Sequence, residues 1–205
     1  MAFTYVVFLT TFLGSLVGAQ VINWGRCEDF GVEQNFNTTA YLGTWYEIEK
    51  SPVRFERGQK CVQATYELED TGHIQVTNEG INIKTGKVTS IVGDAFAPDP
   101  NEAAKLKVRF FLWQPAGDYW VLNTDYDTFS VVYSCQDFLG IARAELAWIL
   151  SRERTLDGQI LASLLSALQD MGLDTSYFKA ADQTGCDQEK SILPWMLKEN
   201  MVNIL

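Results

Sequence analysis

The chain has 205 residues, a formal net charge of −10 and a single histidine. This acidic balance, with no basic stripe, argues against a nucleic-acid partner. The sequence contains no Gly-rich phosphate loop, metal-ligand spacing or nucleophile elbow, so we expect neither a metal site nor an enzyme.

The N-terminal segment predicts export. Residues 1–19 carry no charged side chain and hold an apolar run that ends in small residues, which is typical of a secretory signal peptide cleaved before Gln20. We therefore expect a secreted, extracellular protein. The remaining length suits one domain with a sizeable core. We divide the chain into a signal peptide at 1–19, one domain at 20–186 and a tail of unknown role at 187–205.

Two features fit an exported chain. An even number of cysteines favours two disulfides over metal or redox chemistry. The cysteines are Cys27, Cys61, Cys135 and Cys186. The tripeptide Asn37-Thr38-Thr39 is an N-glycosylation sequon, so we expect Asn37 to be a glycan site at the surface.

Between Trp45 and Arg152 the dominant hydrophobic period is two, which indicates strands with one dry and one wet face. The alternation is clearest at 105–110, and Gly-, Pro- and Asp-rich turns separate the runs. We predict eight strands, at 45–50, 61–68, 73–79, 87–95, 105–113, 119–124, 128–135 and 141–150.

A helix follows the strands. Apolar residues from Leu156 to Met171 recur at spacings of three and four, which predicts an amphipathic helix that Gly172 ends. Many short strands with brief connections and then one helix predict an all-β fold: an eight-stranded antiparallel up-and-down β-barrel with the helix packed outside. A β-sandwich is the rival fold, and it usually needs longer crossover connections.

Up-and-down connectivity brings the start of the first strand and the end of the eighth to one end of the barrel. Trp45 and Arg152 should meet there as a cation–π pair, with Gly43 allowing a sharp backbone turn beneath the indole. Asp125 should bind backbone N–H groups of its own turn at the same end. This end is therefore expected to be closed, and the loops at 51–60, 113–118 and 135–140 should rim an open mouth opposite.

The same connectivity constrains the disulfides. Cys61 and Cys135 both fall at the open rim, three strand steps apart, about 12–14 Å, which is too far for a direct bond. Each must take Cys27 or Cys186, and the geometry leaves open which.

Several of these residues carry a family resemblance. The three signature positions of the lipocalins occur here in order: Gly43 with Trp45, then Thr124, Asp125 and Tyr126, then Arg152. More narrowly, the stretches at 35–52, 104–115, 119–135 and 148–152 resemble the apolipoprotein D and insect Lazarillo branch of that family. The resemblance covers residues 27–186.

The resemblance implies an eight-stranded calyx that carries one small hydrophobic molecule, such as a fatty acid, a sterol-like lipid, a retinoid or a bilin. It also implies the pairs Cys27–Cys135 and Cys61–Cys186. No further cofactor is expected. Alternation alone cannot show that the interior is empty, because a barrel filled by its own side chains has the same pattern.

Candidate ligand-binding residues come from the dry phase of the strands. They are Tyr66, Val76, Asn78, Phe110, Leu112 and Trp148. Asn78 is a polar group on an apolar phase and would hydrogen-bond a carboxylate or carbonyl, unless it is a strand-end residue facing solvent. Glu47 and Glu49 share the phase of Trp45, so they must be accommodated near the mouth or by a bend.

We therefore expect a secreted carrier of a small hydrophobic ligand. One alternative is a bilin-binding chromoprotein. Another is a protein that docks on a membrane, a lipid particle or a receptor through apolar rim residues, unless these turn inward and narrow the entrance. The rim residues are Val53, Phe55, Phe111, Leu112, Trp113, Pro115, Phe138 and Leu139. The single histidine, His73, falls on an outward phase, where a solvated role is expected.

Overall fold

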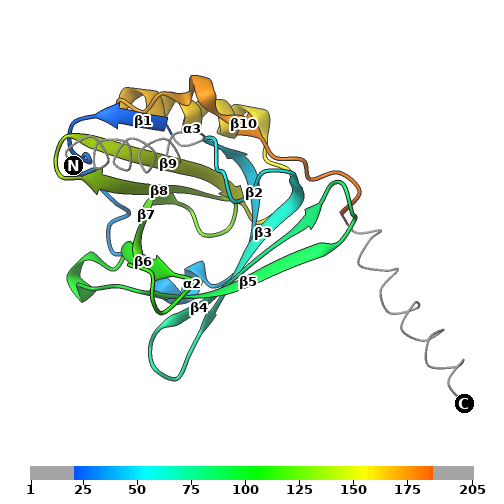
Figure 1. The fold of residues 1–205 in the computed structure, drawn as a ribbon, viewed down its shortest axis with the longest axis horizontal. Coiled ribbons are helices and arrows are strands. Elements are labelled where there is room, and N and C mark those ends of the chain that lie inside the picture. The colour runs from blue at the N-terminus through cyan, green and yellow to red at the C-terminus, as the bar shows by residue number, and fades with distance from the viewer. Residues whose placement is uncertain (1–20, 187–205) are drawn as a thin grey trace, which may run out of the picture.

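The computed structural model describes residues 21–186, which form one continuous antiparallel sheet closed into a barrel (Figure 1). The strand order is β1-β9-β8-β7-β6-β5-β4-β3-β2-β10, and a further pairing of β9 with β2 closes the barrel. The elements are β1 (Val21–Trp24), α2 (Thr38–Tyr41), β2 (Gly43–Lys50), β3 (Gln59–Leu68), β4 (Ile74–Asn82), β5 (Val88–Phe96), η1 (Pro100–Glu102), β6 (Lys105–Arg109), β7 (Gly117–Thr124), β8 (Phe129–Phe138), β9 (Ala142–Ser151), α3 (Gly158–Asp170), η2 (Thr175–Tyr177) and β10 (Lys179–Ala180).

The eight strands β2 to β9 confirm the predicted up-and-down barrel, because each pairs with its neighbour in sequence and the last pairs with the first. That closure excludes the β-sandwich. Two short strands were not predicted. β1 pairs with Ala142–Glu145 of β9, and β10 pairs with Glu49 and Lys50 of β2. Runs of four and two residues are too short to show a period, so only their neighbours identify them.

The helix follows the predicted face. Asp157 caps it by accepting hydrogen bonds from the N–H groups of Gln159 and Ile160, at 2.8 and 3.2 Å. Gly172 lies just beyond its end with φ +89°, the left-handed conformation that terminates helices. Leu164 and Leu168 are buried against the outer face of β8 and β9, so α3 packs outside the barrel (Figure 1).

The closed end has the predicted construction. The Trp45 side chain is fully buried, and the Arg152 guanidinium lies over its ring at 3.8 Å from the centroid. Gly43 has φ +91°, which confirms a backbone turn that favours glycine. Asp125 accepts hydrogen bonds from the N–H groups of Thr128 and Phe129, at 2.8 and 2.9 Å. These contacts seal one end and leave the other for an entrance.

Both disulfides pair as the resemblance implied. Cys27 bonds to Cys135 and Cys61 bonds to Cys186, with Cα atoms 5.9 and 5.6 Å apart. Each therefore joins the open rim to a terminal segment, and within residues 21–186 no cysteine is left free. No helix in this range is long and apolar enough to cross a membrane. The predicted signal peptide and tail lie outside the described residues.

The sequon asparagine is exposed, and its side-chain oxygen caps α2 by accepting a hydrogen bond from the Ala40 N–H at 3.1 Å. The position of Asn37 is therefore compatible with a glycan. Its modification stays a prediction.

Candidate functional site

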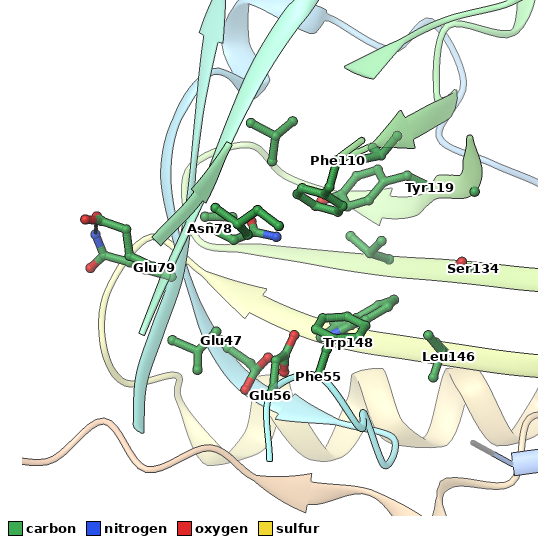
Figure 2. A pocket seen from close by; sticks show the side chains of 18 of the residues that line it. Glu47, Phe55, Glu56, Asn78, Glu79, Phe110, Tyr119, Ser134, Leu146 and Trp148 are labelled. Carbon is green, nitrogen blue, oxygen red and sulfur yellow. Dashed lines mark hydrogen bonds between the residues drawn. The ribbon is translucent and has the colours of Figure 1, made fainter. Parts of the chain in front are cut away.

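A cavity of about 620 Å³ occupies the barrel interior (Figure 2). This volume lies within the range of small-molecule sites, roughly 300–1,000 Å³. The barrel is therefore not filled by its own side chains. Aromatic and aliphatic side chains from β3, β4, β6, β8 and β9 form most of the wall, so the interior suits an apolar ligand.

Five of the six candidate ligand-binding residues line this cavity: Tyr66, Val76, Asn78, Phe110 and Trp148. The prediction for Leu112 was wrong, because its side chain is 90% exposed. β6 ends at Arg109, and the chain then turns, with the Gln114 N–H donating to the Phe111 carbonyl at 3.0 Å. The alternation that placed Leu112 inside therefore stops before it reaches that residue.

Asn78 is the polar group of the side wall. It is half-buried, and its side chain points into the cavity from β4 between Ala64 of β3 and Ile91 of β5 (Figure 2). Its amide makes no hydrogen bond to any residue in the described range. The amide is thus available to a ligand, and the solvent-facing alternative does not apply.

The floor is a network of hydroxyl groups. The Tyr66 and Tyr119 hydroxyls lie 2.7 Å apart, Tyr119 and Tyr41 3.0 Å apart, and Tyr41 lies 2.9 Å from Ser130 Oγ. Burial raises the pKa of Tyr41 to about 12, and burial likewise raises the pKa values of Tyr66 and Tyr119 well above normal. The phenols therefore stay protonated and neutral.

These four hydroxyls carry four hydrogens but share only three hydrogen bonds. One O–H donor is therefore left over by the network. Tyr66 and Tyr119 both line the cavity, so a hydroxyl at this end of the site can donate a hydrogen bond to a ligand oxygen.

A charged trio forms the other polar feature. Lys50 Nζ lies 2.5 Å from Glu47 Oε1 and also contacts Glu56 Oε2. The Glu47 side chain is 3% exposed, and both glutamates line the cavity. Burial, followed by the neighbouring Glu56, raises the pKa of Glu47 well above its usual value.

The sequence located part of this trio. Glu47 shares the inward phase of Trp45, as expected, and a β-bulge between Glu47 and Glu49 supplies the bend. Glu47 lies opposite the lining residue Leu150, whereas Glu49 lies opposite Ile149, which packs under α3. Glu56 was missed because it lies in a loop without periodicity. Tyr119 was also missed, although its alternation with buried Val121 was a usable signal.

The rim is mixed. Val53 is buried but is not among the residues that line the cavity, whereas Phe55 and Phe111 line the cavity while remaining exposed. Other predicted rim residues project into solvent: Leu112, Trp113, Phe138 and Leu139. The apolar cavity therefore opens among exposed apolar side chains.

The single histidine lies outside the cavity. His73 Nδ1 lies 2.7 Å from Asp94 and its ring stacks on Phe96, outside the cavity lining. Across residues 21–186, no group of His, Cys, Asp and Glu side chains is arranged to hold a metal ion.

Comparison with known proteins agrees with this geometry. Residues 36–183 match the family model for a lipocalin-like domain. The chain is 38% identical to apolipoprotein D of Macaca fascicularis over 89% of this chain and 97% of that protein. It is 34% identical to the Lazarillo protein of Schistocerca americana, over 77% of this chain and 75% of that protein. The solved structure of insecticyanin from the tobacco hornworm Manduca sexta superposes with a TM-score of 0.71 at 28% identity, covering 82% of this chain and 91% of that one. The chain therefore belongs to the lipocalin family.

Proposed function

We propose that this protein is a non-enzymatic extracellular carrier that holds one small hydrophobic ligand, such as a lipid, in the barrel cavity. The open apolar cavity is the observation that carries this proposal. Two disulfides and the predicted signal peptide support an extracellular location. The similarity to apolipoprotein D and Lazarillo supports a shared role.

The driving force is burial of apolar surface. Each CH₂ group moved from water into an apolar wall contributes about 0.8 kcal/mol, so a long hydrocarbon is held without any covalent step. Asn78 and the tyrosine hydroxyls then orient the polar end of the ligand. Release requires only an environment, such as a lipid bilayer, that solvates the hydrocarbon of the ligand better than the cavity does.

The test is fluorescence titration of the delipidated protein, with its disulfides intact, by a long-chain lipid, a sterol and biliverdin. We expect saturable one-to-one binding of one class. Trp148→Ala should weaken it about tenfold or more, because an indole face of the wall is lost. Trp24→Ala is the matched control, since Trp24 is exposed on β1. Failure of all three ligands to saturate would refute the carrier proposal. If biliverdin is the one ligand of the three that binds and the complex has a visible absorption band, the result would favour the bilin-binding chromoprotein.

The rim supports a second candidate function, contact with a lipid surface from which the ligand is collected. The exposed rings of Phe111 and Trp113 stack at 5.4 Å between centroids beside the cavity entrance, and Leu112 lies between them in sequence. Such side chains gain free energy on entering a bilayer interface.

Flotation with phosphatidylcholine vesicles tests this second function. Replacing both Leu112 and Trp113 by Ser should abolish co-flotation and leave ligand binding intact. Leu68→Ser is the control, because Leu68 is exposed at the closed end of the barrel. Equal flotation of all three proteins would contradict the rim function.

A further inference from the structure

The charged groups inside the cavity are acidic. In Figure 2 the Glu47 and Glu56 side chains lie together beside Trp148. Glu79 is also among the lining residues, and its Oε2 accepts a hydrogen bond from Gln63 Nε2 at 3.0 Å. Among the described residues that line the cavity there is no lysine, arginine or histidine. A ligand's polar group therefore meets carboxyls, amides and hydroxyls, and no cation of the wall.

Lys50 is the cation that contacts the lining carboxyls of Glu47 and Glu56. The Lys50 ammonium is shared between Glu47 and Glu56, and its side chain is 15% exposed. If the two carboxyls share one proton, the trio is neutral; if both are ionised, its charge is −1. Neither state is positive, so the trio offers no counter-ion to an anionic ligand.

The carboxyls also retain hydrogen-bonding capacity. Glu47 Oε1 lies 2.5 Å from the Lys50 ammonium, which also contacts Glu56 Oε2, so both carboxyls are held as acceptor groups in the lining of the cavity. An acceptor in this position suits an O–H or N–H donor of a ligand. A ligand carboxylate brought beside these groups would instead pay desolvation and like-charge repulsion. The net charge of −10 acts in the same direction.

We propose that the cavity selects lipids whose polar group is an uncharged or cationic hydrogen-bond donor over long-chain carboxylates, with Glu47 and Glu56 setting the preference. The inference rests on the proposed carrier function and narrows the class of ligand. Asn78 and the tyrosine floor accept either class, because they are neutral and carry oxygen or amide groups of both polarities.

The experiment uses three probes that share one hydrocarbon chain and differ only in the head group: hexadecanol, hexadecylamine and hexadecanoate. Each displaces the neutral dye Nile red from the disulfide-intact protein at neutral pH. We expect the alcohol and the amine to bind at least about tenfold more tightly than the carboxylate, a difference of about 1.4 kcal/mol.

Two variants locate the determinant. In the double variant Glu47→Gln with Glu56→Gln, the Lys50 ammonium loses both partners, so the preference should shift toward hexadecanoate. Glu56→Gln alone, in the loop between β2 and β3, should reduce the preference for the alcohol and the amine and leaves Glu47 paired with Lys50. Glu67→Gln removes an exposed carboxylate of β3 that is not among the residues lining the cavity, and it should leave the wild-type order unchanged.

The outcomes are separable. Equal binding of alcohol and carboxylate by the wild-type protein would overturn the inference and leave the carrier function standing. An unchanged preference in the double variant would also overturn it, because the glutamates would then not set the order. Failure of all three probes to displace Nile red would overturn the carrier proposal and the inference together.

Discussion

Arg152 should be worth more to this fold than an ordinary surface arginine. Its guanidinium donates to three backbone carbonyls, those of Ala40, Thr44 and Tyr126, at 2.9, 3.0 and 2.9 Å. It also covers the ring of Trp45 at 3.8 Å. The carbonyls belong to α2, β2 and the turn between β7 and β8, so one side chain joins three segments at the closed end.

The magnitude follows from these contacts. A hydrogen bond to a charged group contributes about 1.5–3 kcal/mol when buried and less when partly solvated, and a cation–π pair contributes about 0.5–2 kcal/mol. Arg152→Met should therefore lower the free energy of unfolding by about 3–6 kcal/mol. Arg152→Lys should lower it by about 2–3 kcal/mol, because lysine keeps the charge over the indole but lacks the planar fork that reaches three carbonyls.

Urea unfolding followed by tryptophan fluorescence and circular dichroism measures these losses. Arg57→Met is the control, because Arg57 is exposed, and it should stay within about 0.5 kcal/mol of wild type. A loss below about 1 kcal/mol for Arg152→Met, at unchanged m-value, would show that the carbonyls find water or other donors and would refute the reasoning.

Three further changes have expected outcomes. Burial, and then Glu56, raises the pKa of Glu47, so the folded state binds a proton more tightly than the unfolded chain, and stability should fall as pH rises above the usual glutamate pKa. Glu47→Gln should make this fall in stability less steep, as measured by urea midpoints at a series of pH values. The same dependence of the midpoint on pH in both proteins would contradict the argument. Gly93→Ala should lower the free energy of unfolding by about 1–3 kcal/mol and distort the cavity wall, because the new Cβ would lie 2.7 Å from the Phe110 ring. Gly158→Ala is the control, because a Cβ at Gly158 has no neighbour within 4 Å. Equal melting temperatures for the two variants would contradict the packing argument. The disulfides join residues 108 and 125 positions apart, so reducing them should lower the free energy of unfolding by about 3–5 kcal/mol each. Thermal melts with and without reductant measure this loss. Unchanged melting temperatures would contradict the prediction and would mean that the reduced unfolded chain is already compact.

The sequence predicted the barrel because, within each strand, apolar and polar residues alternate and so identify the face that points inward. Alternation in runs such as 105–110 identifies strands without reference to any partner, and eight of them with short connections leave little choice of topology. From that topology alone the meeting of Trp45 with Arg152 followed, and the structure confirms it. Inward residues on regular strands, such as Tyr66 and Phe110, were located for the same reason.

Features without a local period depended on tertiary structure. Leu112 was misplaced because β6 ends early, and Glu56 was missed because loop residues carry no phase. The strands β1 and β10 exist only through their pairing with β9 and β2. The spacing of the cysteines did not decide between the two possible disulfide arrangements, because each of them pairs one terminal cysteine with Cys61 and the other with Cys135.

By itself, therefore, the sequence determined the class of fold, the closed end and the side of each strand that faces inward, because these follow from local periodicity and chain order. Only the tertiary structure decided that side chains leave a cavity in the barrel and that the charged residues lining it are acidic. Cavity volume and charge pairing arise from side chains of distant segments, as Lys50 between Glu47 and Glu56 illustrates, and no single stretch of sequence records them.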